Sequence, residues 1–146
     1  MGLRPPVSAA LECALTTAIE DLDRLEQEWR ALYDSALSPG PPQGYPFVRA
    51  AWQAYGGPSG MDFAVATCRQ DGRLVGLWPV CRTRSAVVHR LESVGFGAGE
   101  EDSGPLVLEG PASARITRAL LHKLRDFGSV VKTTVPADHP LVKPRI

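Results

Sequence analysis

The feature that most constrains this chain is a two-residue turn between two apolar runs. Asp71 and Gly72 separate segment 61–69 from segment 74–82, and both segments are rich in apolar, strand-forming residues. A type I′ turn requires positive φ at both central residues, which Asp-Gly adopts more readily than most pairs. The sequence therefore predicts a tight antiparallel hairpin over residues 61–82, followed by a third strand over 87–94.

A two-residue turn also predicts the register of this hairpin. It places Cys68 opposite Val75 and Val65 opposite Trp78, with side chains alternating between the two faces. One face then carries Phe63, Val65, Trp78 and Val80, and the other carries Ala64, Ala66, Cys68, Val75 and Leu77. Because both faces are apolar, we expect both to be covered. Pro79 has no N–H for the ladder, which predicts a bulge or broken pairing at residues 78–79.

The rest of the chain alternates helices with short strands. Apolar residues recur at three- and four-residue intervals over 21–36, over 47–55 and between Gly110 and Gly128, which predicts three helices. Short strands are expected over 13–19, 105–108 and 130–135. The order, (β)ααβββαβ, predicts an α/β fold with a mixed, mostly antiparallel sheet and helices on both faces.

Length and charge limit what the chain can be. Its 146 residues suffice for one domain with a core, which we place at 13–136, after a loose segment 1–12. Residues 137–146 are then either a C-terminal tail or the start of a missing second half. A formal net charge of zero disfavours nucleic-acid binding. No apolar run approaches the roughly 20 residues of a membrane span, and the first residues make a poor signal peptide, so we expect a soluble, cytoplasmic protein.

The cysteines and histidines do not form a recognisable ligand set. In the predicted register Cys81 falls opposite Asp62, far from Cys68, so no bridge between these two thiols is expected. An odd number of cysteines in a cytoplasmic chain favours free, buried thiols. No Cys-x-x-Cys pair occurs, and the three histidines share no ligand spacing, so no metal site is expected.

The candidate site residues fall into two groups. In the glycine-rich loop 95–104, three acids occur in a row; Asp102 is the candidate general base, and Glu101 and Ser103 are candidates for binding the substrate. A solvated acidic loop is the alternative interpretation. The second group, Arg49 and Trp52, lies on the predicted helix 47–55 and can reach a ligand, although an Arg on a helix surface is usually only solvated. The sequence contains no nucleophile motif.

An ordered set of residues carries a family resemblance over about residues 19–142. The set comprises Leu25, Glu28, Trp29 and Leu32; Pro46, Phe47 and Trp52; the run from Asp71 to Gly76 with Pro79 and Val80; Leu91, Gly95 and Asp102; and the run from Val135 to Leu141. In this order the chain resembles the N-terminal half of GNAT-superfamily acyltransferases of the cellulose-biosynthesis (CelD-like, BioF2-like) type.

The resemblance implies a GNAT-type α/β fold, usually duplicated in a longer chain, that transfers an acyl group from acetyl-CoA or another acyl-CoA to a small-molecule amine. The superfamily's pyrophosphate loop, Q/R-x-x-G-x-G/A, would lie at 108–113, where this chain has Glu109 and Pro111 and no Gly-x-Gly. In this family the acyl-CoA loop is expected in the second half. We therefore expect an acyltransferase domain that is not catalytically complete alone.

Its expected partner is the missing C-terminal half or a second copy in a homodimer. The alternative function is a non-catalytic module that binds a substrate or a protein with the same fold.

Overall fold

The centre of the molecule is a six-stranded sheet. The structure is a computed structural model, and it describes residues 10–36, 39–56, 61–82, 90–94, 104–128 and 130–132. The strands within these residues are β1 (Leu11–Thr16), β2 (Asp62–Gln70), β3 (Arg73–Arg82), β4 (Arg90–Ser93), β5 (Leu106–Val107) and β6 (Val130–Lys132). The helices are α1 (Ile19–Asp23), α2 (Glu26–Asp34), the 3-10 turn η1 (Pro41–Gln43), α3 (Tyr45–Tyr55) and α4 (Ser113–Leu124).

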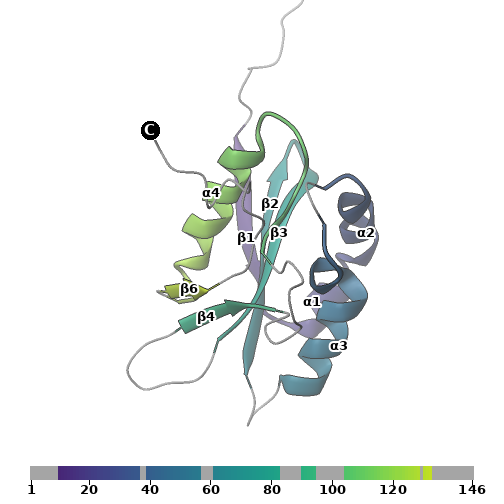
Figure 1. The fold of residues 1–146 in the computed structure, drawn as a ribbon, viewed down its shortest axis with the longest axis vertical. Coiled ribbons are helices and arrows are strands. Elements are labelled where there is room, and N and C mark those ends of the chain that lie inside the picture. The colour runs from purple at the N-terminus through teal and green to yellow at the C-terminus, as the bar shows by residue number, and fades with distance from the viewer. Residues whose placement is uncertain are drawn as a thin grey trace, which may run out of the picture.

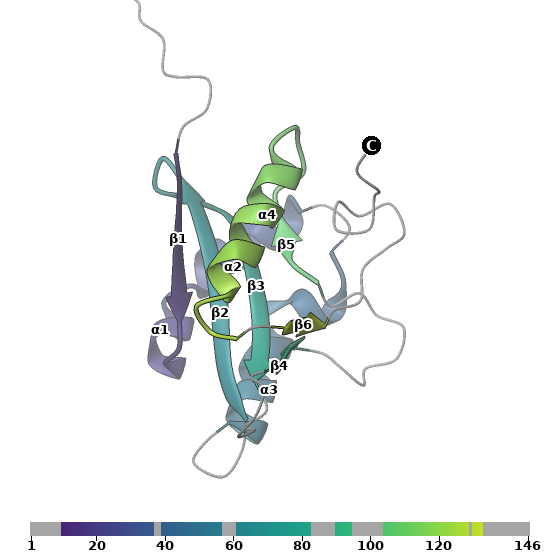
Figure 2. The same cartoon turned by 90° about the vertical axis from the view of Figure 1, so that its left-hand side faces the viewer.

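Most strand pairs in this sheet are antiparallel. The order is β1-β2-β3-β4-β6, and β5 pairs with β3 beside β4. Both β4 and β5 run antiparallel to β3, whereas β6 runs parallel to β4. Helices α1, α2 and α3 lie on one face of the sheet and α4 on the other, as Figure 1 and the turned view in Figure 2 show. The predicted α/β class, with a mostly antiparallel sheet and helices on both faces, is confirmed.

Each face of the sheet has its own apolar core. The core under α1–α3 contains Leu22, Leu25, Trp29, Leu32, Tyr45, Val48, Trp52, Phe63, Val65, Leu74, Leu77, Cys81, Val94 and Leu106. The core under α4 contains Ala64, Ala66, Cys68, Val75, Trp78, Val80, Leu91, Val107, Ile116, Leu120, Leu124 and Phe127. The expectation that both faces of the hairpin are covered is therefore confirmed. Among the described residues, no helix has the length and apolar character needed to cross a bilayer.

The predicted helix over 21–36 is two helices. The chain bends at Arg24 and Leu25, where the N–H of Arg24 bonds to the carbonyl of Asp21 and that of Leu25 to the carbonyl of Leu22. These are three-residue bonds, which tighten the chain and change the direction of the axis. Because of this bend, α1 contacts α3 and β1, while α2 contacts β3 and β5.

The turn prediction is confirmed but the register prediction is wrong. Asp71 and Gly72 have φ values of 53° and 79°. The register shifts between Cys68 and Arg69, however, so that Cys68 lies opposite Gly76. A bulge of this kind adds one residue to one strand and moves the following side chains to the other face. Trp78 and Val80 consequently lie in the core under α4, and Leu77 lies in the core under α1–α3.

No bulge occurs at Pro79. Against β2 the register is continuous there, with Pro79 opposite Val65. The carbonyl of Pro79 accepts from the N–H of Val94, which lies directly after β4. In a strand, the N and O of one residue point to the same side. The missing N–H of Pro79 therefore points away from β2, to the edge of β3 that β5 and β4 share. It lies where pairing with β5 ends and pairing with β4 begins, so no bond to β2 is lost.

Candidate functional site

The candidate site is the junction at which β5 leads into α4. Strand β5 pairs with the middle of β3, and the N–H of Leu108 extends this pairing with a bond to the carbonyl of Val75 (2.9 Å). After a short turn the chain enters α4 and then reaches β6, which pairs with β4. Strands β4 and β5 both run antiparallel to β3, and β6 runs parallel to β4. Strands β5 and β6 therefore run in the same direction. The N-terminus of α4 thus follows the carboxyl end of β5, which is the usual position of anion sites in α/β folds.

The first turn of α4 is not neutralised by an acid. Its N-cap residue, Ala112, provides no side-chain cap, and no acidic residue lies in the first turn. The N–H of Ser113 bonds to the carbonyl of Gly110 (3.2 Å), and that of Ile116 to the carbonyl of Ala112 (2.9 Å). Arg115 adds a positive charge to the same turn. Among the described residues, no acid within this turn offsets the positive end of the helix dipole.

Two residues of the connecting turn oppose anion binding. Glu109 is exposed and carries a negative charge, and Pro111 removes one backbone donor. The N–H of Glu109 bonds to the carbonyl of Ser35 (3.2 Å), which ties the turn to the end of α2. Gly110 has φ +151° and open space around it. The turn is thus held in place, but it is not a glycine-rich phosphate loop.

A buried glutamine holds the entrance to β5. Gln43 is 3% exposed. Its Nε2 donates to the carbonyls of Gly104 (2.8 Å) and Pro105 (3.0 Å), and its Oε1 accepts from the N–H of Gly40 (2.6 Å). The indole N–H of Trp29 in turn donates to the carbonyl of Gln43 (2.8 Å). Sequence analysis missed Gln43, although a glutamine within a Pro-Pro-Gln-Gly run is the kind of polar residue whose amide can satisfy loop carbonyls.

Three of the predicted site residues lie outside the described residues. These are Glu101, Asp102 and Ser103, which directly precede Gly104 in the chain. Their assignment as base and substrate-binding residues stays a prediction. Gln43 fixes the backbone at Gly104 and Pro105, directly before β5.

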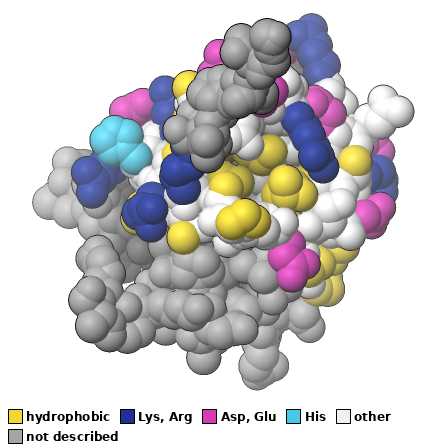
Figure 3. Space-filling view, turned by 90° about the horizontal axis from the view of Figure 1, so that it is seen from above, with side chains coloured by type: hydrophobic (Ala, Val, Ile, Leu, Met, Phe, Trp, Pro, Cys, Tyr) yellow, Lys and Arg dark blue, Asp and Glu magenta, His cyan; other side chains and the backbone are white. Residues whose placement is uncertain are grey.

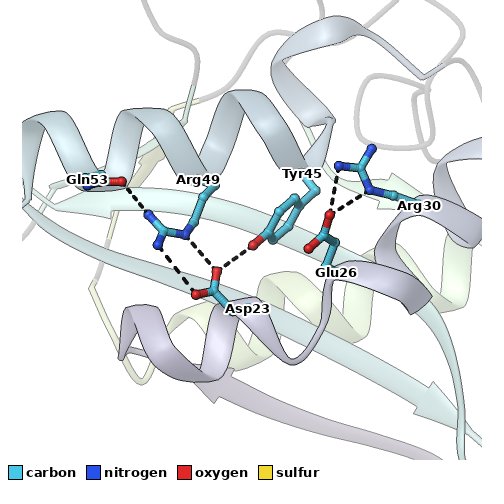
Figure 4. A network of polar contacts seen from close by, with 6 residues as sticks. All are labelled: Asp23, Glu26, Arg30, Tyr45, Arg49 and Gln53. Carbon is cyan, nitrogen blue, oxygen red and sulfur yellow. Dashed lines mark hydrogen bonds and ion pairs between the residues drawn. The ribbon is translucent and has the colours of Figure 1, made fainter.

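Arg49 belongs to a polar network between α1 and α3. Figure 4 shows Asp23 of α1 between Tyr45 and Arg49 of α3. Asp23 accepts from Arg49 Nε (2.7 Å) and from the Tyr45 hydroxyl (2.5 Å), and Arg49 Nη1 donates to Gln53 (2.8 Å). The Arg49 guanidinium, followed by the Tyr45 hydroxyl, lowers the pKa of the Asp23 carboxyl below its ordinary value. Burial, followed by the bond to Asp23, raises the pKa of Tyr45 to about 12.

Trp52 is a core residue in this structure. It is 9% exposed and its ring stacks on that of Phe63, with centroids 5.6 Å apart and an interplanar angle of 20°. Both Arg49 and Trp52 lie on α3, on the face of the sheet opposite α4 (Figure 1). The structure therefore does not bring them to the α4 N-terminus. A part for them in substrate binding stays a prediction.

The surface around the candidate site combines apolar and charged groups. Figure 3 looks onto the end of the molecule at which α4 begins and shows apolar side chains grouped together, with Lys, Arg and acidic side chains around them. A separate shallow hollow of 160 Å³ lies between α2 and β3, lined by Glu28, Ala31, Leu32, Ser35, Arg73 and Leu74. Ligand pockets commonly measure about 300–1,000 Å³, so this hollow is too small for a cofactor. The described residues include no group of three or more potential metal ligands.

Comparisons with known proteins find likeness in structure only. No family model matches the sequence, and no curated protein matches it. Several solved structures are similar, and two of them are N-acetyltransferases. One is the ribosomal-protein-alanine N-acetyltransferase from Brucella melitensis biovar Abortus 2308, with 18% identity, a TM-score of 0.48, and coverage of 88% of this chain and 82% of that one. The other is the aminoglycoside N-acetyltransferase AAC(6')-Iy in complex with CoA, with 13% identity, a TM-score of 0.47, and coverage of 92% and 82%.

Proposed function

We propose that this chain is a GNAT-like domain of an acyl-CoA-dependent N-acyltransferase and that it needs further residues to complete its active site. The observation that carries the proposal is the N-terminus of α4, which follows the carboxyl end of β5 without a side-chain cap or an acid in its first turn. Such a helix end binds phosphate through free N–H groups and the helix dipole. A diphosphate-bearing acyl-CoA fits this chemistry. The narrower CelD-like, BioF2-like subtype rests on the sequence resemblance.

Segment 104–108, which contains β5, connects the anion position to the predicted acidic segment. Gly104, held by Gln43, lies four residues before Leu108, where β5 reaches the turn into α4. At roughly 3.3 Å per residue the two ends are about 13 Å apart along the strand. An extended cofactor with phosphates at one end and a thioester at the other can follow this strand. The proposal places the thioester next to residues 101–103.

The chemistry then requires a base and a positioned amine. In acyl transfer the amine nitrogen attacks the thioester carbonyl, the thiol leaves, and a proton is removed from the nitrogen. Asp102 is our candidate for the group that accepts this proton. Glu101 and Ser103 are candidates for binding the amine substrate. The proposed cofactor position at α4 rests on described residues, whereas the proposed substrate residues lie outside them.

Titration calorimetry with acetyl-CoA tests the proposal. Ser113→Asp places a carboxylate in the first turn of α4, and Ser113→Asn is its neutral, equal-sized control. An acid at this position stabilises a helix by about 0.3–1 kcal/mol, so it should not lower the melting temperature. We expect the wild type and Ser113→Asn to bind and Ser113→Asp to bind at least tenfold more weakly. Equal affinities of the two variants would refute the anion site at α4.

Glu109→Gln provides a second variant in the opposite direction. Removing the exposed charge next to the first turn should tighten acetyl-CoA binding, because a like charge close to the diphosphate is unfavourable. The gain should shrink at high salt, since exposed charges are screened. Unchanged affinity at low salt would mean that the diphosphate does not lie beside this turn.

The alternative function is a non-catalytic module that binds a substrate or a protein. Glu109 and Pro111 favour it, since one repels an anion and the other removes a donor at the same turn. This alternative predicts no acetyl-CoA binding by the wild type or by Glu109→Gln. A homodimer, or a missing C-terminal half as partner, also remains our proposal. Sedimentation equilibrium of this chain tests the homodimer, and a monomer at all concentrations would refute it.

A further inference from the structure

Two cysteines lie opposite each other on the two strands at one edge of the sheet. β1 is the outer strand next to β2, and in their antiparallel register Cys13 lies directly opposite Cys68. The neighbouring pairs, Glu12 with Arg69 and Ala14 with Thr67, follow without a shift. The two cysteines are 55 positions apart in the sequence, and the pairing of β1 with β2 brings them together.

The backbone geometry at this pair is suited to a disulfide. Directly opposed residues of an antiparallel pair have Cα atoms about 4.5 or 5.5 Å apart, depending on the hydrogen-bonding site. A disulfide requires a Cα separation of about 4.4–6.8 Å, which includes both values. Its Cβ atoms must approach to about 3.5–4.5 Å, slightly closer than in an unlinked pair. β1 can make this approach because it is an edge strand.

The two side chains point to the same face of the sheet, towards the core under α4. Cys68 is fully buried in the core under α4, and the half-buried Cys13 packs against that core. The third cysteine, Cys81, lies in the core on the opposite face. The sheet itself therefore separates Cys81 from this pair, and each of the two thiols has the other as its neighbour.

We propose that Cys13 and Cys68 form a reversible disulfide when the protein meets a small-molecule disulfide such as oxidised glutathione. The more exposed Cys13 reacts first. Its thiolate attacks the small disulfide, forms a mixed disulfide and releases one small thiolate, which takes up a proton. The Cys68 sulfur then attacks the Cys13 sulfur, loses its proton and releases the second small thiol. Two protein thiols are oxidised, and one small disulfide is reduced to two thiols.

The order of these steps follows from the surroundings of the two thiols. Burial, followed by the interaction with the Cys13 thiol, raises the pKa of Cys68 to about 12. Cys68 therefore stays protonated in the reduced protein, and attack begins at the thiol that solvent reaches. The direct opposition of Cys13 and Cys68 in the strand pair then favours the second step over release of the mixed disulfide.

The disulfide would close the segment that contains α1, α2 and α3. Linking Cys13 to Cys68 closes a loop of roughly 55 residues in the unfolded chain, and loops of that length give large stabilisation in the chain-entropy model. We expect the melting temperature of the oxidised protein to exceed that of the reduced protein by about 10 °C. A reductant should restore the original melting temperature.

The test is mass spectrometry of the full chain after incubation with oxidised glutathione. We expect the mass to fall by two hydrogen atoms and a linked peptide that contains Cys13 and Cys68. The matched control Cys81→Ala should give the same mass loss and the same linked peptide. In Cys68→Ala we expect a stable glutathione adduct on Cys13 instead. The same stable adduct on the wild type, a link that involves Cys81, or a link between two chains would each overturn the proposal.

A second readout does not depend on the variants folding. Alkylation of the wild-type protein in its native state should modify Cys13 before treatment with oxidised glutathione and neither Cys13 nor Cys68 afterwards. Continued alkylation of Cys13 in the treated protein would contradict the disulfide, because a bridged sulfur cannot be alkylated.

Discussion

A single methyl group added at Gly76 should push α4 away from the sheet. Gly76 lies on β3, opposite Cys68 and beside the bulge. A Cβ atom there would lie 2.5 Å from Cγ2 of Ile116 and 3.2 Å from Cδ1 of Leu120. Both partners are fully or almost fully buried, so neither side chain can turn into solvent. Gly76→Ala therefore forces a shift of the helix or the strand.

The expected cost follows from two opposing effects. Carbon atoms pack best at about 3.5–4.0 Å, so the contact with Ile116 is short by about 1 Å. Overpacking of this kind costs about 1–3 kcal/mol. Replacing glycine by alanine also restricts the unfolded chain, which stabilises by about 0.4–1 kcal/mol. We expect Gly76→Ala to lower the free energy of unfolding by about 1–2 kcal/mol.

A double-mutant cycle with Ile116→Ala measures this contact directly. Urea unfolding of the wild type, the two single variants and the double variant gives the four free energies of unfolding. Ile116→Ala alone should cost about 2–5 kcal/mol through the cavity it leaves. The double variant should be less destabilised than the sum by about 0.5–3 kcal/mol, because the new methyl group occupies part of that cavity. Strict additivity would refute the close approach of α4 to Gly76.

Two further predictions concern the polar contacts of Gln43 and of Asp23. Gln43→Leu should lower the free energy of unfolding by about 2–4 kcal/mol in urea, because it leaves the buried carbonyls of Gly104 and Pro105 and the N–H of Gly40 without their partner. Gln43→Glu keeps the oxygen that accepts from Gly40 but loses the amide that donates to Gly104 and Pro105. A Gln43→Glu variant as stable as the wild type would show that the bonds to Gly104 and Pro105 do not contribute to stability. The pKa of Asp23 is lowered from 3.8, so its stabilising contribution is complete above that value and is lost as the pH falls through the lower folded pKa. The difference in melting temperature between the wild type and Asp23→Asn should therefore shrink below pH 3.8, and a difference that does not change with acid would contradict the ion pair with Arg49.

Most of the secondary structure could be predicted because it depends on neighbours in the chain. The Asp71-Gly72 turn is a clear case, since positive φ at two adjacent residues is a local property of those residues. The stripes of apolar residues on α3 and α4 are local in the same sense. The bend at residues 24–25 was missed because the stripe of the predicted helix continues unbroken across it, and only the different strands under α1 and α2 separate the two helices.

The register of the hairpin could not be predicted from the turn alone. The bulge opposite Cys68 lies where Gly76 allows α4 to approach β3, and that contact involves residues about 40 positions later in the chain. The one-residue shift decides which core receives Trp78 and Leu77. Pro79 misled the prediction because its missing N–H faces the edge where β5 gives way to β4, not β2.

The sequence by itself determined most of the elements, the apolar character of both sheet faces and the α/β class, because these follow from periodicity and local backbone preferences. The tertiary structure alone decided which distant groups meet: Gln43 with the carbonyl of Gly104, 61 residues away, and Cys13 with Cys68. It also decided that β5, which leads into α4, pairs with the middle of β3. Such meetings depend on strand order and helix packing, which sum many weak contacts between residues far apart in the chain.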